Sequence, residues 1–402
     1  MYAIVYMFSF IIGYLALFHV RFNYKWIPAV FVAICFGLLA ASMVPRPEQY
    51  VDTKRFFSSL DQFRFLSQQT GFLSAWRDLN STFSYSDVPL AALFIAVGSQ
   101  FPSNHVFMFI VGFIISLGAV LIILQIDKDT DSNNRVTKKI AFAIFFSWFN
   151  FQAAVQGVRN MIAFVVLSVC AYYLMNTQLR IDLKHVVVVC IGMSTVWMHP
   201  SSILAIALIG ITLLVSNTII LRVLDGILLT YGFFQSTILP FILRIPFISN
   251  SVSLVFKTNQ YLTNSGDNDL SSSVSLFRDL LKDGLLILII TAIFFAIRTY
   301  DNKKTFSMMT TRYREYFIAI TCLTIGSISN GILFDRLSNL LIIVGLPYLA
   351  VGLNEILVSV RKTNSTANKI FVSMLVLAAF VASVAFLGDN LRAGVKFYSM
   401  FY

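Results

Sequence analysis

Charged residues are scarce in this sequence. Asp, Glu, Lys and Arg make up 12% of the 402 residues, whereas a soluble domain has about 25%. Hydrophobic residues make up 57% of the chain, and the mean hydropathy is +0.78. This composition excludes an ordinary soluble protein and predicts an integral membrane protein. The net charge of +11 requires no nucleic-acid partner, because cytoplasmic loops of membrane proteins are enriched in Lys and Arg.

Motifs for cofactors and metals are also lacking. The four cysteines fall inside apolar runs, and none is placed for a disulfide or a metal cluster. There is no Walker loop, no dinucleotide-binding glycine pattern, and no second His or Cys near His199. We therefore expect no cofactor and no metal. The chain shows no repeat of fixed period and no soluble segment, so residues 1–402 are predicted to form a single integral membrane domain.

Long apolar runs are abundant. A membrane span needs about 17–25 residues, and the candidate spans are 2–20, 26–44, 104–126, 140–156, 158–176, 186–199, 200–216, 223–243, 281–298, 316–334, 337–358 and 370–388. The run 88–101 is too short to cross and is expected to dip into the membrane or to pack against the bundle. Met1–Val20 has no basic region before its apolar run and is expected to be retained. The predicted fold is an all-α polytopic membrane protein with about 12 transmembrane helices plus re-entrant or interfacial helices.

The positions of the basic residues predict the orientation. If the N-terminus lies outside, the loops on the inner side hold 17 of the 30 Lys and Arg residues, as the positive-inside rule favours. Two long outer loops then follow, 45–103 and 244–282. The first loop has apolar residues at helical spacing, namely Phe56, Leu60, Phe63 and Leu66. Such a helix can lie flat on the bilayer surface or cover the top of the bundle, and both alternatives stay open.

Polar residues interrupt the apolar runs at the predicted outer face. Arg159 opens a span in a very short connection, and His199 and Arg336 lie at the ends of other spans. Ionisable groups at a membrane span are costly and usually functional, although an Arg there can also be a topology anchor and Asp335 can simply pair with Arg336. Arg suits bidentate recognition of phosphate oxygens. Together these residues predict one outward site for an anionic group.

A diphosphate is the anion that this pattern fits best. In lipid-linked sugar transfer the leaving group is a polyprenyl diphosphate, which departs more easily when its developing charge is neutralised. The acceptor hydroxyl then needs a base within hydrogen-bond reach. The sequence offers Asp52, Asp335 or His199 for that role, and it does not decide among them.

Four segments, in this order, resemble the Wzy/EpsG-type polysaccharide polymerases. They are Arg46 with Asp52 and Phe56, then Phe151–Ala163, then Met198–Ile203, and finally Asp335–Asn339 followed by Leu346 and Pro347. The sequence departs from the family pattern at three points. The Gly expected before Asp52 is missing, Asn160 stands where Gln is commoner, and no outer-loop arginine has the Arg-x10-Gly spacing of some polymerases.

The resemblance implies a metal-independent glycosyltransferase, similar to the membrane-embedded, all-helical GT-C-type enzymes. Such a polymerase works in the bacterial inner membrane with its active site facing the periplasm or exterior. It transfers a growing glycan from undecaprenyl diphosphate to the non-reducing end of a new lipid-linked repeat unit, probable inversion being the expected stereochemistry. The products are O-antigen of lipopolysaccharide, capsule or exopolysaccharide. Expected partners are the lipid-linked oligosaccharides, membrane lipid, a chain-length regulator and a flippase.

The resemblance also implies roles for the site residues. Those expected to bind the diphosphate are Arg46, Arg159, His199 and Arg336. Those expected to act on the acceptor hydroxyl are Asp52, Asp335 and His199. Those expected to contact sugar or phosphate are Gln156, Asn160, Lys257, Tyr261 and Arg278.

Two other functions stay open. An O-antigen ligase uses the same donor with another acceptor, and only the glycan phenotype of a deletion separates it from a polymerase. A flippase for the lipid-linked unit, or another transporter, is the second alternative. Against a transporter, the spans 158–176, 186–199, 316–334 and 337–358 carry no ionisable residue at mid-membrane and no inverted repeat is visible.

Overall fold

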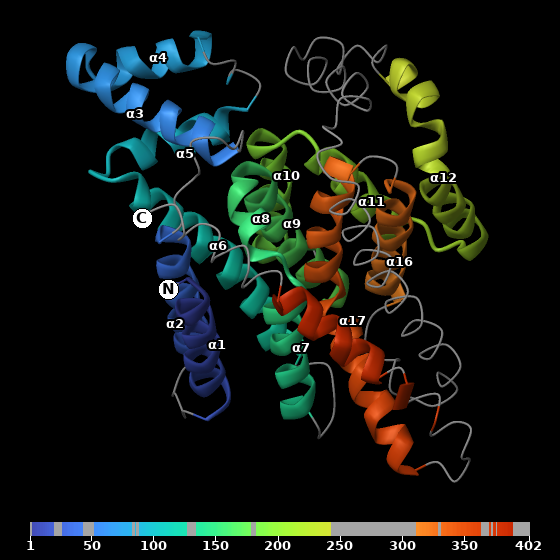
Figure 1. The fold of residues 1–402 in the computed structure, drawn as a ribbon. Helices are drawn as coiled ribbons and strands as arrows, with labels where there is room; N and C mark the ends of the chain where they lie inside the picture. The colour runs from blue at the N-terminus through green and yellow to red at the C-terminus, as the bar shows by residue number, and fades with distance from the viewer. Residues whose placement is uncertain are drawn as a thin grey trace, which may run out of the picture.

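The computed structural model of the chain is a bundle of helices (Figure 1). It describes residues 2–19, 26–42, 52–82, 85, 88–126, 134–177, 182–242, 311–328, 331–362, 370, 373–374 and 376–388. Within these residues there is no strand. Three helical segments are long and apolar enough to cross a membrane, namely Asn104–Gln125, Val158–Asn176 and Arg336–Asn354. The chain is therefore all-helical with candidate membrane spans, as its composition predicts.

The helices follow one another with short connections. They are α1 (Tyr2–Phe18), α2 (Trp26–Ala41), α3 (Asp52–Thr70), α4 (Phe72–Thr82), α5 (Pro89–Ser99), α6 (Asn104–Gln125), α7 (Asn134–Trp148), α8 (Phe151–Gln156), α9 (Val158–Asn176), α10 (Leu183–Met198), α11 (Ser202–Leu214), α12 (Thr218–Ile242), α16 (Thr311–Gly326) and α17 (Gly331–Lys362). A further apolar helix, Val376–Gly388, follows α17. The predicted span 281–298 and the loop 244–282 lie outside the described residues.

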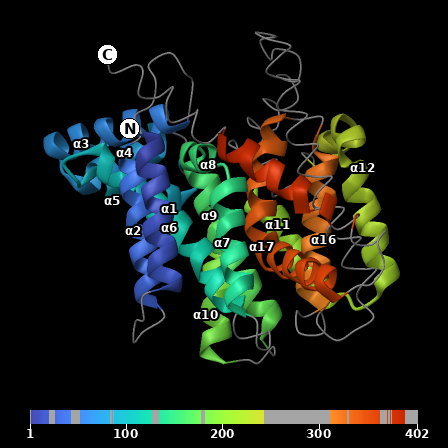
Figure 2. The same ribbon diagram turned by 60° about the horizontal axis from the view of Figure 1, so that its bottom comes forward.

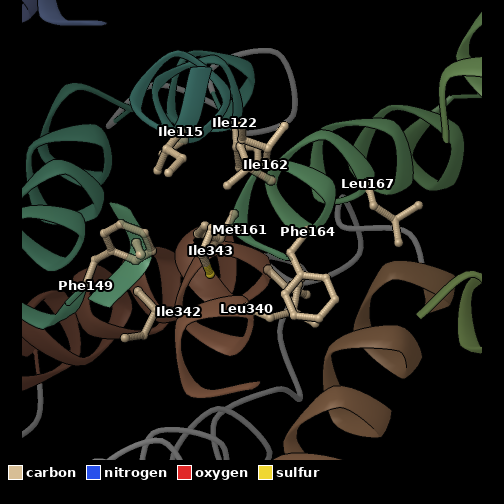
Figure 3. Packing of buried hydrophobic residues seen from close by; sticks show 14 of the residues in the cluster. Ile115, Ile122, Phe149, Met161, Ile162, Phe164, Leu167, Leu340, Ile342 and Ile343 are labelled. Carbon is tan, nitrogen blue, oxygen red and sulfur yellow. The ribbon is translucent and has the colours of Figure 1, made fainter. Parts of the chain in front are cut away.

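The middle of the bundle is the contact between α9 and α17. In the apolar windows of these two helices, 78% and 94% of the residues are buried. Met161 and Phe164 of α9 face Ile343 and Leu340 of α17 (Figure 3). Both helices pack with apolar side chains along their length, so the start of each helix is held in a fixed place at the same end of the bundle. We call this end, where α9, α11 and α17 begin, the site end.

The predicted span 140–156 is wrong as a single helix, because it divides into α7 and α8 at Phe149 and Asn150. A continuous helix would use the Phe146 carbonyl to accept from the Asn150 N–H. That carbonyl accepts instead from the Tyr6 hydroxyl at 2.7 Å, and the Asn150 N–H donates to Asn339 Oδ1 at 3.2 Å. Contacts with α1 and α17 therefore replace the bond that would continue the helix.

The boundary between α10 and α11 lies at His199 and Pro200. The His199 N–H makes the last bond of α10, to the Thr195 carbonyl at 2.9 Å. Pro200 has no N–H with which to continue the helix. The chain turns there and α11 starts two residues later, so His199 is held at the turn between two apolar helices.

Residues 52–99 form three helices that lie across the site end, beside α2 and α6 (Figures 1 and 2). Phe56, Leu60 and Phe63 of α3 are at most 3% exposed, and α3 contacts α5 and α8. The predicted apolar face of this segment therefore packs on the protein, so of the two alternatives it is the covering helix that the structure supports.

Arg64 fixes α3 to the connection between α5 and α6. Its guanidinium donates to the carbonyls of Ser99 and Phe101, both at 3.1 Å, and to Asn104 Oδ1 at 3.0 Å. It also pairs with Asp61 at 2.7 Å. Below it, α5 is an 11-residue helix, about 16 Å long and about half the thickness of a hydrocarbon core.

Candidate functional site

A chain of hydrogen bonds joins the turn after α10 to the first turn of α9. His199 Nδ1 lies 2.6 Å from Ser201 Oγ, and Ser201 Oγ donates to Asn160 Oδ1 at 2.9 Å. His199 and Asn160 are buried, at 6% and 3% exposure. Two residues that lie 39 positions apart in the sequence, and that were both predicted as site residues, are therefore connected through one serine.

This chain has a consequence for the histidine ring. If the Ser201 hydroxyl proton points to Asn160, Ser201 Oγ can only accept from His199, so the proton of the neutral ring sits on Nδ1. The ring nitrogen that can then take a proton is Nε2. The 3.3 Å contact between the Ser201 N–H and Nδ1 competes with this arrangement, but the 2.6 Å contact to the hydroxyl is much the shorter of the two.

The amide of Asn160 is only half satisfied. Its Nδ2 is buried and has no hydrogen-bond partner among the described residues. Three buried hydroxyls at the same end also lack one, namely Thr53 Oγ1, Ser202 Oγ and Ser338 Oγ. Buried polar atoms are almost always paired, and an unpaired one costs about 1–3 kcal/mol. Their accumulation at helix starts marks this end as a place for a polar ligand.

Arg159 lies beside this chain with its charge available. Its guanidinium carbon is 5.5 Å from the ring centre of Phe56 and 5.6 Å from that of Tyr85, distances at which cation–π attraction operates. Within the described part of the chain, no carboxylate or hydrogen-bond acceptor pairs with it, and the side chain is partly exposed. The outer-loop segment therefore holds the cation without neutralising it.

The backbone adds to the positive character of the site end. The α9 and α11 helices begin at Val158 and Ser202, and neither Gly157 nor Ser201 caps its helix with a side-chain hydrogen bond. Helix starts carry a partial positive charge and unpaired N–H groups. Together with Arg159 and the Asn160 amide, they present donors and positive charge on one side of the bundle, an arrangement that suits phosphate oxygens.

Arg336 lies close to the same region through its helix. Asn339, one turn further along α17, accepts from the Asn150 N–H at the start of α8, and α8 leads directly into α9. Arg336 is partly exposed. The structure thus brings α17 against the segment that carries Gln156, which is the last residue of α8 and is partly exposed.

Several predicted site residues cannot be placed. Arg46, Lys257, Tyr261 and Arg278 lie outside the described residues. Asp52 and Asp335 belong to α3 and α17, but their side chains are outside the described part. Among the described residues there is no group of three or more His, Cys, Asp or Glu that could hold a metal ion.

The sequence interpretation missed four contributors to the site. Ser201 links His199 to Asn160, and Phe56 and Tyr85 lie beside Arg159. Asn339 positions α17 against α8. Two of them could have been found from spacing, because Ser201 follows His199 by two residues and Asn339 follows Arg336 by one helical turn. The aromatic pair depends on how α3 folds over α9, which no local spacing reveals.

A second charged cluster lies at the other end of the bundle and is not part of this site. Arg222 of α12 pairs with Asp225 at 2.5 Å and with Glu315 of α16 at 2.6 Å, and Arg314 also contacts Glu315 at 3.0 Å. Because each carboxylate in this cluster is paired with an arginine, the cluster ties α12 to α16.

Comparison with known proteins gives no match: no family model, no curated protein and no solved structure is similar to this chain.

Proposed function

We propose that this protein is a membrane-embedded glycosyltransferase that works without a metal, and specifically a polysaccharide polymerase. The observation that carries the proposal is the joining of Arg159, Asn160 and His199 at one end of the bundle. This combination supplies an uncompensated cation, a free amide donor and an imidazole. The four sequence segments that resemble the Wzy/EpsG-type polymerases support the same function.

In the proposed reaction the anomeric carbon of the growing glycan leaves the oxygen of undecaprenyl diphosphate and forms a new bond to an acceptor hydroxyl. The diphosphate takes the electrons of the broken bond, so stabilising its charge lowers the barrier. Arg159, the Asn160 Nδ2 donor and the start of α9 would serve this purpose, with Arg336 and Arg46 as further ligands. No cation is needed for this role.

The acceptor hydroxyl loses a proton in the same step. We assign that proton to His199 Nε2, since the hydrogen bond to Ser201 places the other ring proton on Nδ1. Asp52 and Asp335 are the remaining candidates for the base from the sequence. Gln156, Lys257, Tyr261 and Arg278 are proposed to contact sugar or phosphate.

The location follows from the same proposal. The distribution of Lys and Arg places the site end on the outer face of the bacterial inner membrane. Donor and acceptor are then both lipid-linked oligosaccharides that reach the site from the surrounding membrane. A chain-length regulator and a flippase are the protein partners that this role implies.

The test is glycan chain length in a deletion strain that carries variants of this protein. Arg159→Ala should reduce polymerisation by about 10²-fold, the usual cost of removing one donor to a developing negative charge, and should leave single repeat units. Arg77→Ala removes an exposed arginine from α4 and should leave the chains long. Normal chain length in Arg159→Ala cells that contain the protein at its usual level would overturn the proposal.

The same strain separates the two alternatives. A single repeat still attached to the lipid A core indicates a polymerase, whereas loss of all attachment indicates an O-antigen ligase. Purified protein that couples lipid-linked sugars in the absence of any ion gradient excludes a flippase or other transporter.

A further inference from the structure

The α3–α4 hairpin carries two sets of apolar residues, and only one of them packs on the protein. Phe56, Leu60 and Phe63 face the bundle and are buried. A second set surrounds the turn at Gly71: Phe65 is 58% exposed, Phe72 is 41% exposed and Leu73 is 76% exposed, with Trp76 partly buried. Contiguous exposed apolar residues mark a surface that something else covers.

The surroundings of this tip indicate what covers it. The α5 helix contacts α3, α4 and α10, and it exposes Leu93 and Val97 at 46% and 49%. The α10 helix exposes apolar residues from its start to its end, with Trp197 at the last turn 58% exposed. A helix with such a face is stable only against lipid, and Trp at its end is typical of the membrane interface. Through α5, the hairpin is thus joined to a lipid-facing wall.

The charge of the hairpin fits a lipid surface. Arg77 is exposed beside Trp76, and no acidic group among the described residues pairs with it. Asp61, which is also exposed, is already paired with Arg64. An unpaired arginine next to exposed aromatic residues is the combination found where amphipathic helices meet phosphate headgroups. The hairpin lies across the bundle rather than along it in both views (Figures 1 and 2), as an interfacial element must.

We propose that the α3–α4 tip is a membrane anchor. Phe65, Phe72, Leu73 and Trp76 enter the boundary between headgroups and acyl chains of the leaflet around the site end, and Arg77 meets the lipid phosphates. The anchor uses residues on the opposite side from the predicted apolar face of α3. Because α3 also carries Phe56, which contacts Arg159, the anchor holds this part of the site roof at a fixed depth. The proposal does not depend on the enzymatic function.

The experiment places an environment-sensitive fluorophore on the tip of the full-length protein. The four native cysteines are replaced by alanine, and Leu73→Cys is labelled and reconstituted into phosphatidylethanolamine–phosphatidylglycerol vesicles at high dilution. Ser58→Cys is the matched control. Ser58 is also exposed on α3 and lies about 20 Å along the helix from the turn at Gly71. Quenching is measured with nitroxide-labelled lipid and, separately, with aqueous iodide.

The anchor predicts opposite results at the two positions. The probe at Leu73 should be quenched at least twice as strongly by nitroxide lipid as the probe at Ser58, and it should be protected from iodide. Equal iodide quenching at both positions would show a tip in water and overturn the proposal. Protection from iodide without nitroxide quenching would also overturn it, because a protein surface such as a second copy would then cover the tip.

Discussion

Ser201 is the residue on which the proposed chemistry depends most directly at the smallest scale. Ser201→Ala removes the donor to the buried Asn160 Oδ1 and the acceptor for His199 Nδ1. Leaving such groups unpaired costs about 1–3 kcal/mol of stability. Because the imidazole also loses its fixed orientation, we expect about a tenfold lower polymerisation rate, which is part of the 10²–10⁴-fold that a positioned base supplies.

The measurement is polymerisation rate together with thermal unfolding in detergent. Ser194→Ala is the control, since the Ser194 hydroxyl bonds only within its own helix, to the Ile191 carbonyl at 2.8 Å. Ser201→Thr keeps a hydroxyl and should restore most of the activity. A Ser201→Ala protein with wild-type rate and a wild-type pH profile would remove the serine from the mechanism.

Asp182 gives a prediction about pH. Its carboxylate accepts from the His185 backbone N–H at 2.8 Å and lies 2.6 Å from His185 Nδ1. The backbone bond first, and the side-chain bond second, hold the pKa of Asp182 below its ordinary value of 3.8. A carboxylate with a lowered pKa stabilises the fold fully above its unfolded pKa, and this stabilisation is lost as the pH falls through the folded pKa.

We therefore expect the melting temperature of the protein to fall between pH 5 and pH 3. Part of that fall should be absent in Asp182→Asn, since the amide oxygen still accepts at the start of α10 but does not titrate. Melting curves in detergent at a series of pH values test this. Identical pH dependence in the two proteins would show that Asp182 contributes nothing to it.

At the scale of elements, the crossing of α2 and α6 depends on glycine. A Cβ at Gly112 would lie 2.5 Å from the Ala40 Cβ and 2.9 Å from the Phe36 carbonyl oxygen. Helices in membranes associate through such close contact of small residues. Gly112→Ala should therefore force the helices apart and destabilise the protein by about 1–3 kcal/mol, the usual range for overpacking.

Gly210 of α11 is the matched position, because nothing lies within 4 Å of a Cβ placed there. Gly210→Ala should be neutral or stabilising by up to about 1 kcal/mol, since Ala has the higher helix propensity. Thermal unfolding of both variants in the same detergent makes the comparison. Equal melting temperatures would show that the α2–α6 contact relaxes without cost.

The elements also show where local sequence pattern is sufficient. The breaks at Pro200 and at the start of α5 follow from proline, and the apolar periodicity of α3 predicts its buried face. The break at Asn150 does not follow from any such signal. It arises because Tyr6 and Asn339, both far away in the sequence, take the groups that would continue the helix.

At the scale of the whole molecule, Arg222 connects α12 to α16 across 93 residues of sequence. Glu315 is only 4% exposed, so removal of Arg222 leaves a buried carboxylate with Arg314 alone. Arg222→Leu should destabilise the protein by roughly 1–3 kcal/mol, less than the 3–5 kcal/mol of a fully buried pair because the arginine is half exposed. Arg312→Leu removes an exposed charge from the same helix as Glu315 and should have little effect.

Unfolding in detergent measures both variants. The double variant Arg222→Leu with Glu315→Leu should recover much of the loss, since no unpaired carboxylate then remains. A similar small loss in Arg222→Leu and Arg312→Leu would indicate that the ion pair does not hold α12 and α16 together.

The sequence by itself determined that this is a helical membrane protein, because composition and the length of apolar runs decide where a chain is stable. It also identified Arg159, Asn160 and His199 as unusual, since polar groups at span ends are costly and stand out. Only the tertiary structure decided that Asn160 and His199 share Ser201, and that Phe56 and Tyr85 lie beside Arg159. Those contacts join residues from separate helices, and their geometry depends on packing, which a one-dimensional pattern does not contain.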